Sequence, residues 1–243
     1  MDRQLEGTHR RPGGMHTVET DVERPDPELV SAFEGVPSAI VSDVMGNTGV
    51  AMDSGIAPVA TGTGMAGTAL TVKASPGDNL IIHRAIAMAE PGDVLVVDGD
   101  GYTETAYMGE LMCASCAAHD LAGVVVDGAV RDREELAAMG FPVYARAFHP
   151  QGPLKGSPGS INVPVSCAGV TVNPGDIVVG DGDGLSVVPA DEAEAVLERS
   201  REKVATEADL RERVEDGEYL YEIGGYDELF EDLSVVGPEE SVR

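Results

Sequence analysis

The chain has 243 residues, of which 42% are hydrophobic, and its 43 acidic residues outnumber the 16 basic ones to give a formal net charge of −27. Nucleic acid is excluded as a direct partner because a polyanion would be repelled. No apolar run approaches the roughly 20 residues of a membrane span, and no signal-peptide pattern is present. We therefore expect a cytoplasmic protein that does not bind membranes. Only three residues are lysines, and this composition resembles that of halophilic proteins, in which salt screens the self-repulsion.

The two ends of the chain are predicted to lie outside one central domain. Residues 1–25 are polar and lack periodicity, which predicts a flexible N-terminal extension. Asp26 followed by Pro27 is typical of a helix start. The domain is expected to cover residues 26–215, and residues 216–243 are expected to form an acidic C-terminal tail.

Helical and strand patterns alternate after this start. Apolar or small residues at helical spacing predict helices at 26–33, 38–45, 78–89, 109–119, 131–139 and 191–214. Short apolar runs predict strands at 67–74, 94–97, 124–126, 143–147, 163–165, 170–172, 177–179 and 185–188. Continuous apolar strands between helices indicate a sheet that is covered on both faces, so we expect an α/β fold.

One motif occurs twice in the chain. The segment PGDVLVVDGDG at 91–101 is repeated closely as PGDIVVGDGDG at 174–184. In each copy, Pro-Gly-Asp predicts a turn that leads into a buried strand and Asp-Gly-Asp-Gly predicts the turn that leaves it. A calcium loop is the alternative, but at the second copy Leu185 and Ser186 begin a strand where an EF-hand needs oxygen ligands. The first copy, through Asp98, is left as a candidate to line a site.

The segment from Gly109 to Glu135 has features that suit an anionic ligand. Gly109 is an acceptable helix N-cap without a side chain, and the first-turn N–H groups that follow it attract a carboxylate. Arg131 comes after a short buried strand, at the kind of strand end where ligands gather in α/β sheets. Its guanidinium can bind a carboxylate through two hydrogen bonds, and the neighbouring Asp132 offers hard oxygen ligands to Mg²⁺ or Mn²⁺.

A purely structural interpretation of the same residues stays open. Asp132 and Glu135 have the spacing of a capping box, and Arg131 could pair with any of the many surface acids. The CxxC at Cys113 and Cys116 is interpreted as two small buried side chains rather than as a zinc or redox site, because no second pair lies nearby.

Three other ionisable residues lie near the predicted site elements or in loops. His83 is interpreted as a core or capping histidine. His149 and Lys155 lie in a loop rich in Pro and Gly that could form the rim of a site.

Across roughly residues 36–200 the chain resembles the family of 4-hydroxy-4-methyl-2-oxoglutarate aldolases and the related regulators of ribonuclease activity (RraA). The resemblance rests on segments that occur in the family's order. They are VSDV at 41–44, DNL at 78–80, the motif at 91–101, GELM at 109–112, GVVVDGAVRD at 123–132, PVYA at 142–145 and 174–189. The resemblance implies a single RraA-like domain, an α/β/α sandwich of the swivelling-domain type, assembled as a homotrimer or hexamer.

The resemblance also implies a class II pyruvate aldolase that depends on a divalent metal, Mg²⁺ or Mn²⁺. Its substrate would be a small 2-oxo acid, and oxaloacetate decarboxylation would accompany aldol cleavage. Asp132 would hold the metal, and Arg131 the substrate carboxylate and keto oxygen. The amides that follow Gly109, those of Leu111 and Met112, would bind the rest of the pyruvyl group.

Two acidic residues also receive roles from the resemblance. Glu110 would orient water at the metal. Glu135 favours catalysis, because the ribonuclease regulators lack an acid three positions after the aspartate. A further acid from a neighbouring subunit belongs to the aldolase picture, and Glu207 is a candidate. The alternative function is a non-catalytic regulator that binds a ribonuclease or helicase.

Overall fold

The computed structural model describes residues 16–47 and 49–233, which form two compact units that meet in the sequence between Glu198 and Arg199. The first unit contains the helices α1 (Pro27–Ser31), α2 (Ser38–Val44), α3 (Leu80–Ile86), α4 (Glu110–Ala118) and α5 (Arg133–Met139). The second contains most of α6 (Ala193–Glu215), which follows a 3-10 turn at Ala190–Glu192, and then α7 (Leu220–Ile223) and α8 (Tyr226–Asp232).

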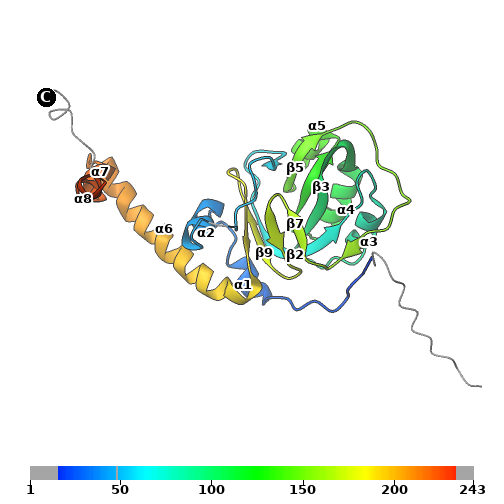
Figure 1. The fold of residues 1–243 in the computed structure, drawn as a ribbon, viewed down its shortest axis with the longest axis horizontal. Coiled ribbons are helices and arrows are strands. Elements are labelled where there is room, and N and C mark those ends of the chain that lie inside the picture. Colours follow the sequence, from blue (N-terminus) through cyan, green and yellow to red (C-terminus); the bar gives the residue numbers. More distant parts are fainter. Residues whose placement is uncertain (1–15, 48, 234–243) are drawn as a thin grey trace, which may run out of the picture. The chain divides into compact units, whose positions relative to one another are not determined.

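Eight strands of the first unit build one curled sheet (Figure 1). They are β1 (Ala57–Pro58), β2 (Met65–Lys73), β3 (Asp93–Met108), β4 (Gly123–Val130), β5 (Val143–Phe148), β6 (Ser160–Ile161), β9 (Ile177–Gly180) and β10 (Leu185–Val188). Within the described residues the order is β1-β5-β4-β3-β2-β9-β10, and β6 pairs with β2. Strands β2 to β5 are parallel neighbours, whereas β1, β6, β9 and β10 pair antiparallel.

Both faces of this sheet are covered, and successive strand residues alternate between them. In β3, Leu95 and Val97 pack into the cluster that includes residues of α3, α4 and α5. Val94 and Val96 point the other way, into a cluster that includes the hairpin of β7 (Val165–Cys167) and β8 (Val170–Val172). This period of two explains why the strand is continuously apolar, and it confirms the predicted α/β class.

The repeated motif folds alike at its start but not at its end. In both copies a buried aspartate accepts a backbone hydrogen bond from the residue three positions before it, Glu90 N to Asp93 Oδ2 at 2.8 Å and Asn173 N to Asp176 Oδ2 at 2.7 Å. The second copy then turns from β9 into β10, as predicted. At the first copy the predicted turn out of the strand is wrong. Residues 99–101 form a bulge instead, and β3 continues to Met108.

The chain ends are described only in part. Within the predicted extension, residues 1–15 lie outside the described residues, and Thr17 N donates to Ser160 Oγ at 3.0 Å beside β6. In the predicted C-terminal tail, residues 234–243 lie outside the described residues. The domain boundaries at residues 25 and 215 stay predictions. None of the described helices is long and apolar enough to cross a bilayer.

Candidate functional site

The central feature of the site is the meeting of two strand ends. β3 and β4 are parallel neighbours, and their last residues, Met108 and Val130, are paired. Gly109 and Arg131 follow these residues directly, so the start of α4 and the Arg131–Asp132 pair lie side by side at the carboxyl edge of the sheet. Ligands gather at such edges in open α/β sheets.

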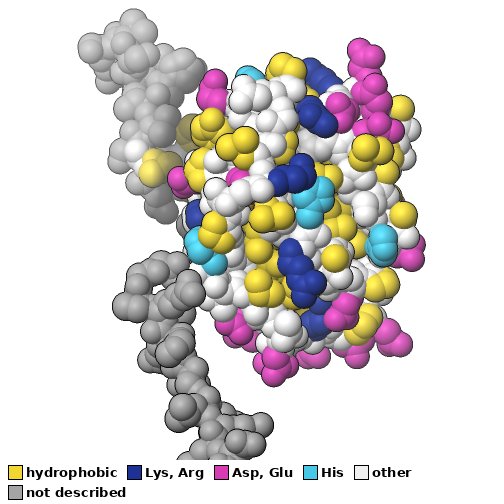
Figure 2. Space-filling model, turned by 90° about the vertical axis from the view of Figure 1, so that its right-hand side faces the viewer, with side chains coloured by type: hydrophobic (Ala, Val, Ile, Leu, Met, Phe, Trp, Pro, Cys, Tyr) yellow, Lys and Arg dark blue, Asp and Glu magenta, His cyan; other side chains and the backbone are white. Residues whose placement is uncertain are grey.

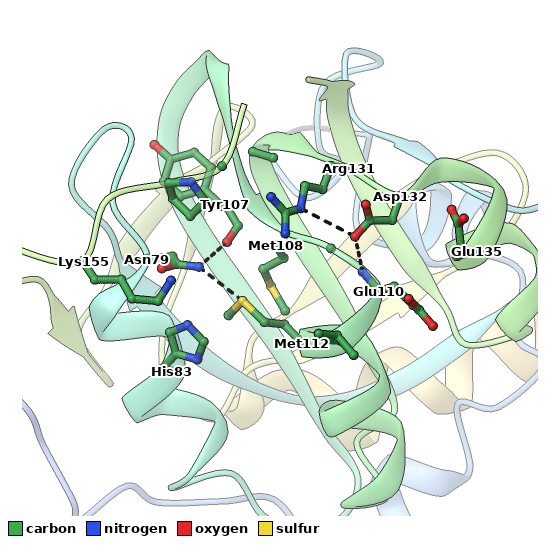
Figure 3. A pocket seen from close by; sticks show the side chains of 15 residues that line it. Asn79, His83, Tyr107, Met108, Glu110, Met112, Arg131, Asp132, Glu135 and Lys155 are labelled. Carbon is green, nitrogen blue, oxygen red and sulfur yellow. Dashed lines mark hydrogen bonds and ion pairs between the residues drawn. The ribbon is translucent and has the colours of Figure 1, made fainter. Parts of the chain in front are cut away.

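The backbone at Asp132 directs its carboxylate towards helix α4. Asp132 has φ 61° and ψ 50°, a left-handed conformation, so α5 begins at Arg133 rather than at Arg131 as predicted. The Asp132 side chain does not cap α5, so the capping-box interpretation of Asp132 and Glu135 is wrong. Instead, Asp132 Oδ2 accepts a hydrogen bond from Glu110 N at 3.0 Å and lies 3.6 Å from Arg131 Nε (Figure 3).

Gly109 leaves space that any side chain would fill. A Cβ there would meet Asp132 Oδ2 and would lie 2.9 Å from Arg131 Cγ. The φ of Gly109 is −151°, an ordinary extended value, so glycine is needed here for close approach rather than for an unusual backbone. In the first turn of α4 the N–H groups of Leu111 and Met112 have no intrahelical acceptor, and both residues line the pocket.

The predicted site residues surround one pocket of about 420 Å³. Gly109, Glu110, Leu111, Met112, Arg131, Asp132 and Glu135 all contribute to its lining. Leu111 is 80% exposed and the Arg131 side chain is 45% exposed, so the pocket opens to solvent on this side. The structure therefore brings these residues together, while their chemical roles stay predictions.

Other lining residues were not singled out by the sequence. Asn79, Ala106, Tyr107, Met108, Gly152 and Pro153 complete the pocket together with His83 and Lys155. The only sequence signal for Asn79 was its place in the segment 78–80. Burial and the charge of Lys155 lower the pKa of His83. His149 and Asp98 do not line the pocket: His149 Nδ1 accepts a bond from Gln151 N at 3.1 Å, and Asp98 pairs with Lys73 at 2.7 Å.

The described residues contain no group of three or more His, Cys, Asp and Glu side chains arranged to hold a metal ion. Cys113 and Cys116 are buried, as predicted, and burial raises the pKa of both thiols to about 12. A hard cation that keeps most of its water and substrate ligands needs only one or two carboxylates. Asp132 Oδ2 accepts the bond from Glu110 N, whereas Asp132 Oδ1 accepts no hydrogen bond from the described part of the chain. This oxygen is therefore available as a ligand for such a cation.

The buried carboxylate of Asp78 holds the loop around Lys155, which lines the pocket. Asp78 accepts hydrogen bonds from Gly156 N at 2.6 Å, from Ser157 N at 2.8 Å and, at the start of α3, from Leu80 N at 2.9 Å. Burial alone would raise the pKa of Asp78, but these bonds and the charge of Lys155 outweigh it and hold the pKa below its ordinary value of 3.8.

We therefore expect Asp78→Asn to lower the free energy of unfolding by about 2 kcal/mol at pH 7, because the charged acceptor of three N–H groups is lost. A lowered pKa stabilises the fold above the unfolded-state value and loses this effect as the pH falls through the folded-state value. The difference from wild type should shrink below about pH 3.8. Urea unfolding between pH 7 and pH 3 measures it, and Asp209→Asn, an exposed position with the same charge change, should behave like wild type.

Comparison with known proteins gives consistent matches. Residues 38–187 match the RraA-like family, described as Aldolase/RraA. A protein of Halalkalibacterium halodurans named "Putative 4-hydroxy-4-methyl-2-oxoglutarate aldolase" is 36% identical over 186 residues, which are 76% of this chain and 88% of that protein.

Solved structures agree with this match. Streptomyces coelicolor RraAS2, titled an unusual member of the RNase ES inhibitor RraA family, has a TM-score of 0.71 at 30% identity over 78% of this chain and 98% of its own. The Thermus RNA-processing inhibitor RraA has a TM-score of 0.58 at 32% identity over 63% of this chain and 92% of its own.

Proposed function

The chain belongs to the RraA-like family, and from that premise we propose that it is a divalent-metal-dependent lyase that cleaves 4-hydroxy-2-oxo acids to pyruvate and also decarboxylates oxaloacetate. The observation that supports this most is the convergence of Arg131, Asp132 and the first turn of α4 on one pocket. A guanidinium, a carboxylate and free backbone N–H groups are what a 2-oxo acid and a hard cation need together.

Each residue has a defined task in this proposal. Arg131 binds the substrate carboxylate through its planar fork. The N–H groups of Leu111 and Met112 donate to the remaining oxygens of the pyruvyl group, with the positive end of the helix dipole behind them. These contacts orient the substrate so that the bond to be broken lies in the open part of the pocket.

Asp132 would hold the metal, Mg²⁺ or Mn²⁺. When bound, the metal supplies a Lewis acid that polarises the 2-keto group. Glu110 orients a water molecule that takes the proton of the 4-hydroxyl group, and Glu135 adds a third carboxylate to the pocket wall beside those of Asp132 and Glu110. Oxaloacetate has no 4-hydroxyl group, so its decarboxylation does not need the water molecule as a base.

The direct test is pyruvate release from oxaloacetate and from 4-hydroxy-4-methyl-2-oxoglutarate with added Mg²⁺, followed by coupled reduction of pyruvate. We expect release from both compounds, its loss in EDTA, and its recovery when excess Mg²⁺ or Mn²⁺ is added. Pyruvate formation no faster than the uncatalysed rate with every metal would overturn the proposal.

The alternative is supported by the solved relatives that are titled RNase ES or RNA-processing inhibitors. A regulator would bind a ribonuclease or helicase and release no pyruvate. We favour the lyase because Glu135 lines the pocket beside Asp132. Assembly as a homotrimer or hexamer and a cytoplasmic location complete the proposal.

A further inference from the structure

The guanidinium of Arg131 is held in place by packing rather than by hydrogen bonds. It donates no hydrogen bond to residues 16–47 or 49–233, and its one ion pair among them joins Nε to Asp132 Oδ2 at 3.6 Å (Figure 3). The terminal nitrogens Nη1 and Nη2 are therefore free to donate to a ligand. An arginine side chain has many rotamers, so the atoms packed around it decide which way this planar fork faces.

Two glycines border this side chain, one along its stem and one at its end. A Cβ at Gly109 would lie 2.9 Å from Arg131 Cγ and 3.2 Å from Nε, and a Cβ at Gly152 would lie 2.9 Å from Nη1. Apart from the residues next to Gly152 in the chain, no other atom of the described structure comes within 4 Å of that second position. Gly152 has no positive φ, so what glycine provides there is space for the guanidinium.

Hydrogen bonds on both sides of Gly152 fix the loop that carries it. Before it, Gln151 O accepts a bond from Ala106 N of β3 at 2.9 Å. After it, Leu154 N donates to Gly77 O at 2.8 Å. The buried carboxylate described above holds the same loop beyond this point. The backbone at Gly152 cannot move away without breaking these bonds, so a methyl group added there would displace the flexible guanidinium and not the loop.

The position of Nη1 matters because attraction alone does not orient an anion. Figure 2 looks onto the right-hand side of Figure 1, where α3 and α4 lie, and shows Lys, Arg and His side chains among apolar ones, with acidic side chains towards the edges. In a chain with a net charge of −27, such a face attracts anions. Two parallel hydrogen bonds from a guanidinium to a carboxylate require in addition that the fork faces the ligand.

We propose that Gly152 is a positioning residue for the Arg131 guanidinium. Because residue 152 has no side chain, Nη1 lies against the loop, and the fork faces the pocket that both residues line. Gly152 acts through Arg131, and it sets how tightly a 2-oxo acid is bound. This inference rests on the proposed function, because Arg131 is the residue proposed there to bind the substrate carboxylate.

The test introduces Gly152→Ala into the full chain in two backgrounds, wild type and Arg131→Lys. In wild type it should weaken pyruvate binding about tenfold, measured by calorimetry with Mg²⁺, as expected when one charge-assisted hydrogen bond is lost. The KM for oxaloacetate should rise by the same factor while kcat stays within about twofold, because the lost contact binds ground state and transition state alike. A lysine at 131 ends short of the Nη1 position, so in that background the second substitution should change pyruvate binding by less than about twofold.

Gly156→Ala is the matched control. It adds the same methyl group to the same loop, where a Cβ meets nothing within 4 Å and the backbone has no positive φ. We expect wild-type pyruvate binding and wild-type kinetics from it, and equal melting temperatures for both alanine variants. An equal loss of binding from Gly152→Ala in the two backgrounds would show that the loop itself responds, and it would contradict the role given to Gly152.

Failure of this inference and failure of the lyase function are distinguishable. If wild type releases pyruvate but Gly152→Ala binds it as Gly156→Ala does, the positioning role is wrong and the lyase function stands. If no compound yields pyruvate while Gly152→Ala weakens pyruvate binding only when Arg131 is present, the positioning role stands and the lyase function is wrong. A crystal structure of Gly152→Ala with Nη1 in its wild-type place would contradict the positioning role whatever the activity.

Discussion

Asp132→Asn should reduce pyruvate release from oxaloacetate by about 10³-fold, to near the uncatalysed rate. The variant removes one negative charge from the residue proposed to hold the metal, and Lewis-acid stabilisation is worth several kcal/mol, with each 1.36 kcal/mol equal to a factor of ten in rate. Asparagine also tolerates the left-handed backbone at φ 61° and can still accept the bond from Glu110 N. The loss would then report chemistry rather than misfolding.

The measurement is steady-state pyruvate formation with saturating Mg²⁺, alongside thermal unfolding of the same preparations. Equal melting temperatures with unequal rates are expected. Asp183→Asn, in the turn between β9 and β10, is the matched charge control and should retain wild-type rates. An Asp132→Asn variant that releases pyruvate at the wild-type rate would show that Asp132 is not needed for the proposed reaction.

Gly109→Ala should lower kcat/KM by about 10²-fold although it adds only one methyl group. The new Cβ would meet the Asp132 carboxylate and approach Arg131 Cγ to 2.9 Å, so both side chains must move. A displacement of about 1 Å in a positioned group can cost 10²-fold in rate. Because the backbone at Gly109 is extended, alanine introduces no torsional strain, and the effect is confined to the neighbours of the methyl group.

Kinetics on both substrates and a pyruvate titration by calorimetry measure this effect. Gly182→Ala is the matched control, since a Cβ there meets nothing within 4 Å and its backbone does not have a positive φ. Wild-type kinetics in Gly109→Ala would show that the close packing around Asp132 is not needed for activity.

The strands of the sheet were predicted well because buried parallel strands appear in the sequence as continuous apolar runs. The apolar runs at 94–97 and 124–126 placed β3 and β4 correctly, and the family resemblance identified the fold. The length of β3 was missed because the Asp-Gly-Asp-Gly of the first copy is typical of a turn that ends a strand. The chain forms a bulge there instead, since β3 resumes its pairing with β4 at Tyr102.

The candidate site was predicted in composition but not in geometry. Strand order is a long-range property, so no local pattern could show that Met108 and Val130 are paired and bring Gly109 beside Asp132. The left-handed backbone at Asp132 was not predicted either, because the local pattern Asp-x-x-Glu is typical of an ordinary capping box. Asn79 carries no charge, and apart from its place in the segment 78–80 only its unsatisfied oxygen in the folded chain draws attention to it.

The conformation at residue 132 has a practical consequence for protein engineering. Glycine accepts positive φ more readily than aspartate does, so a design that replaces left-handed residues by glycine would select Asp132→Gly. The selected protein would have lost the carboxylate that lies between Glu110 N and Arg131, and with it the acceptor of the Glu110 N–H group. Engineering of this protein should therefore keep residue 132 fixed from the outset.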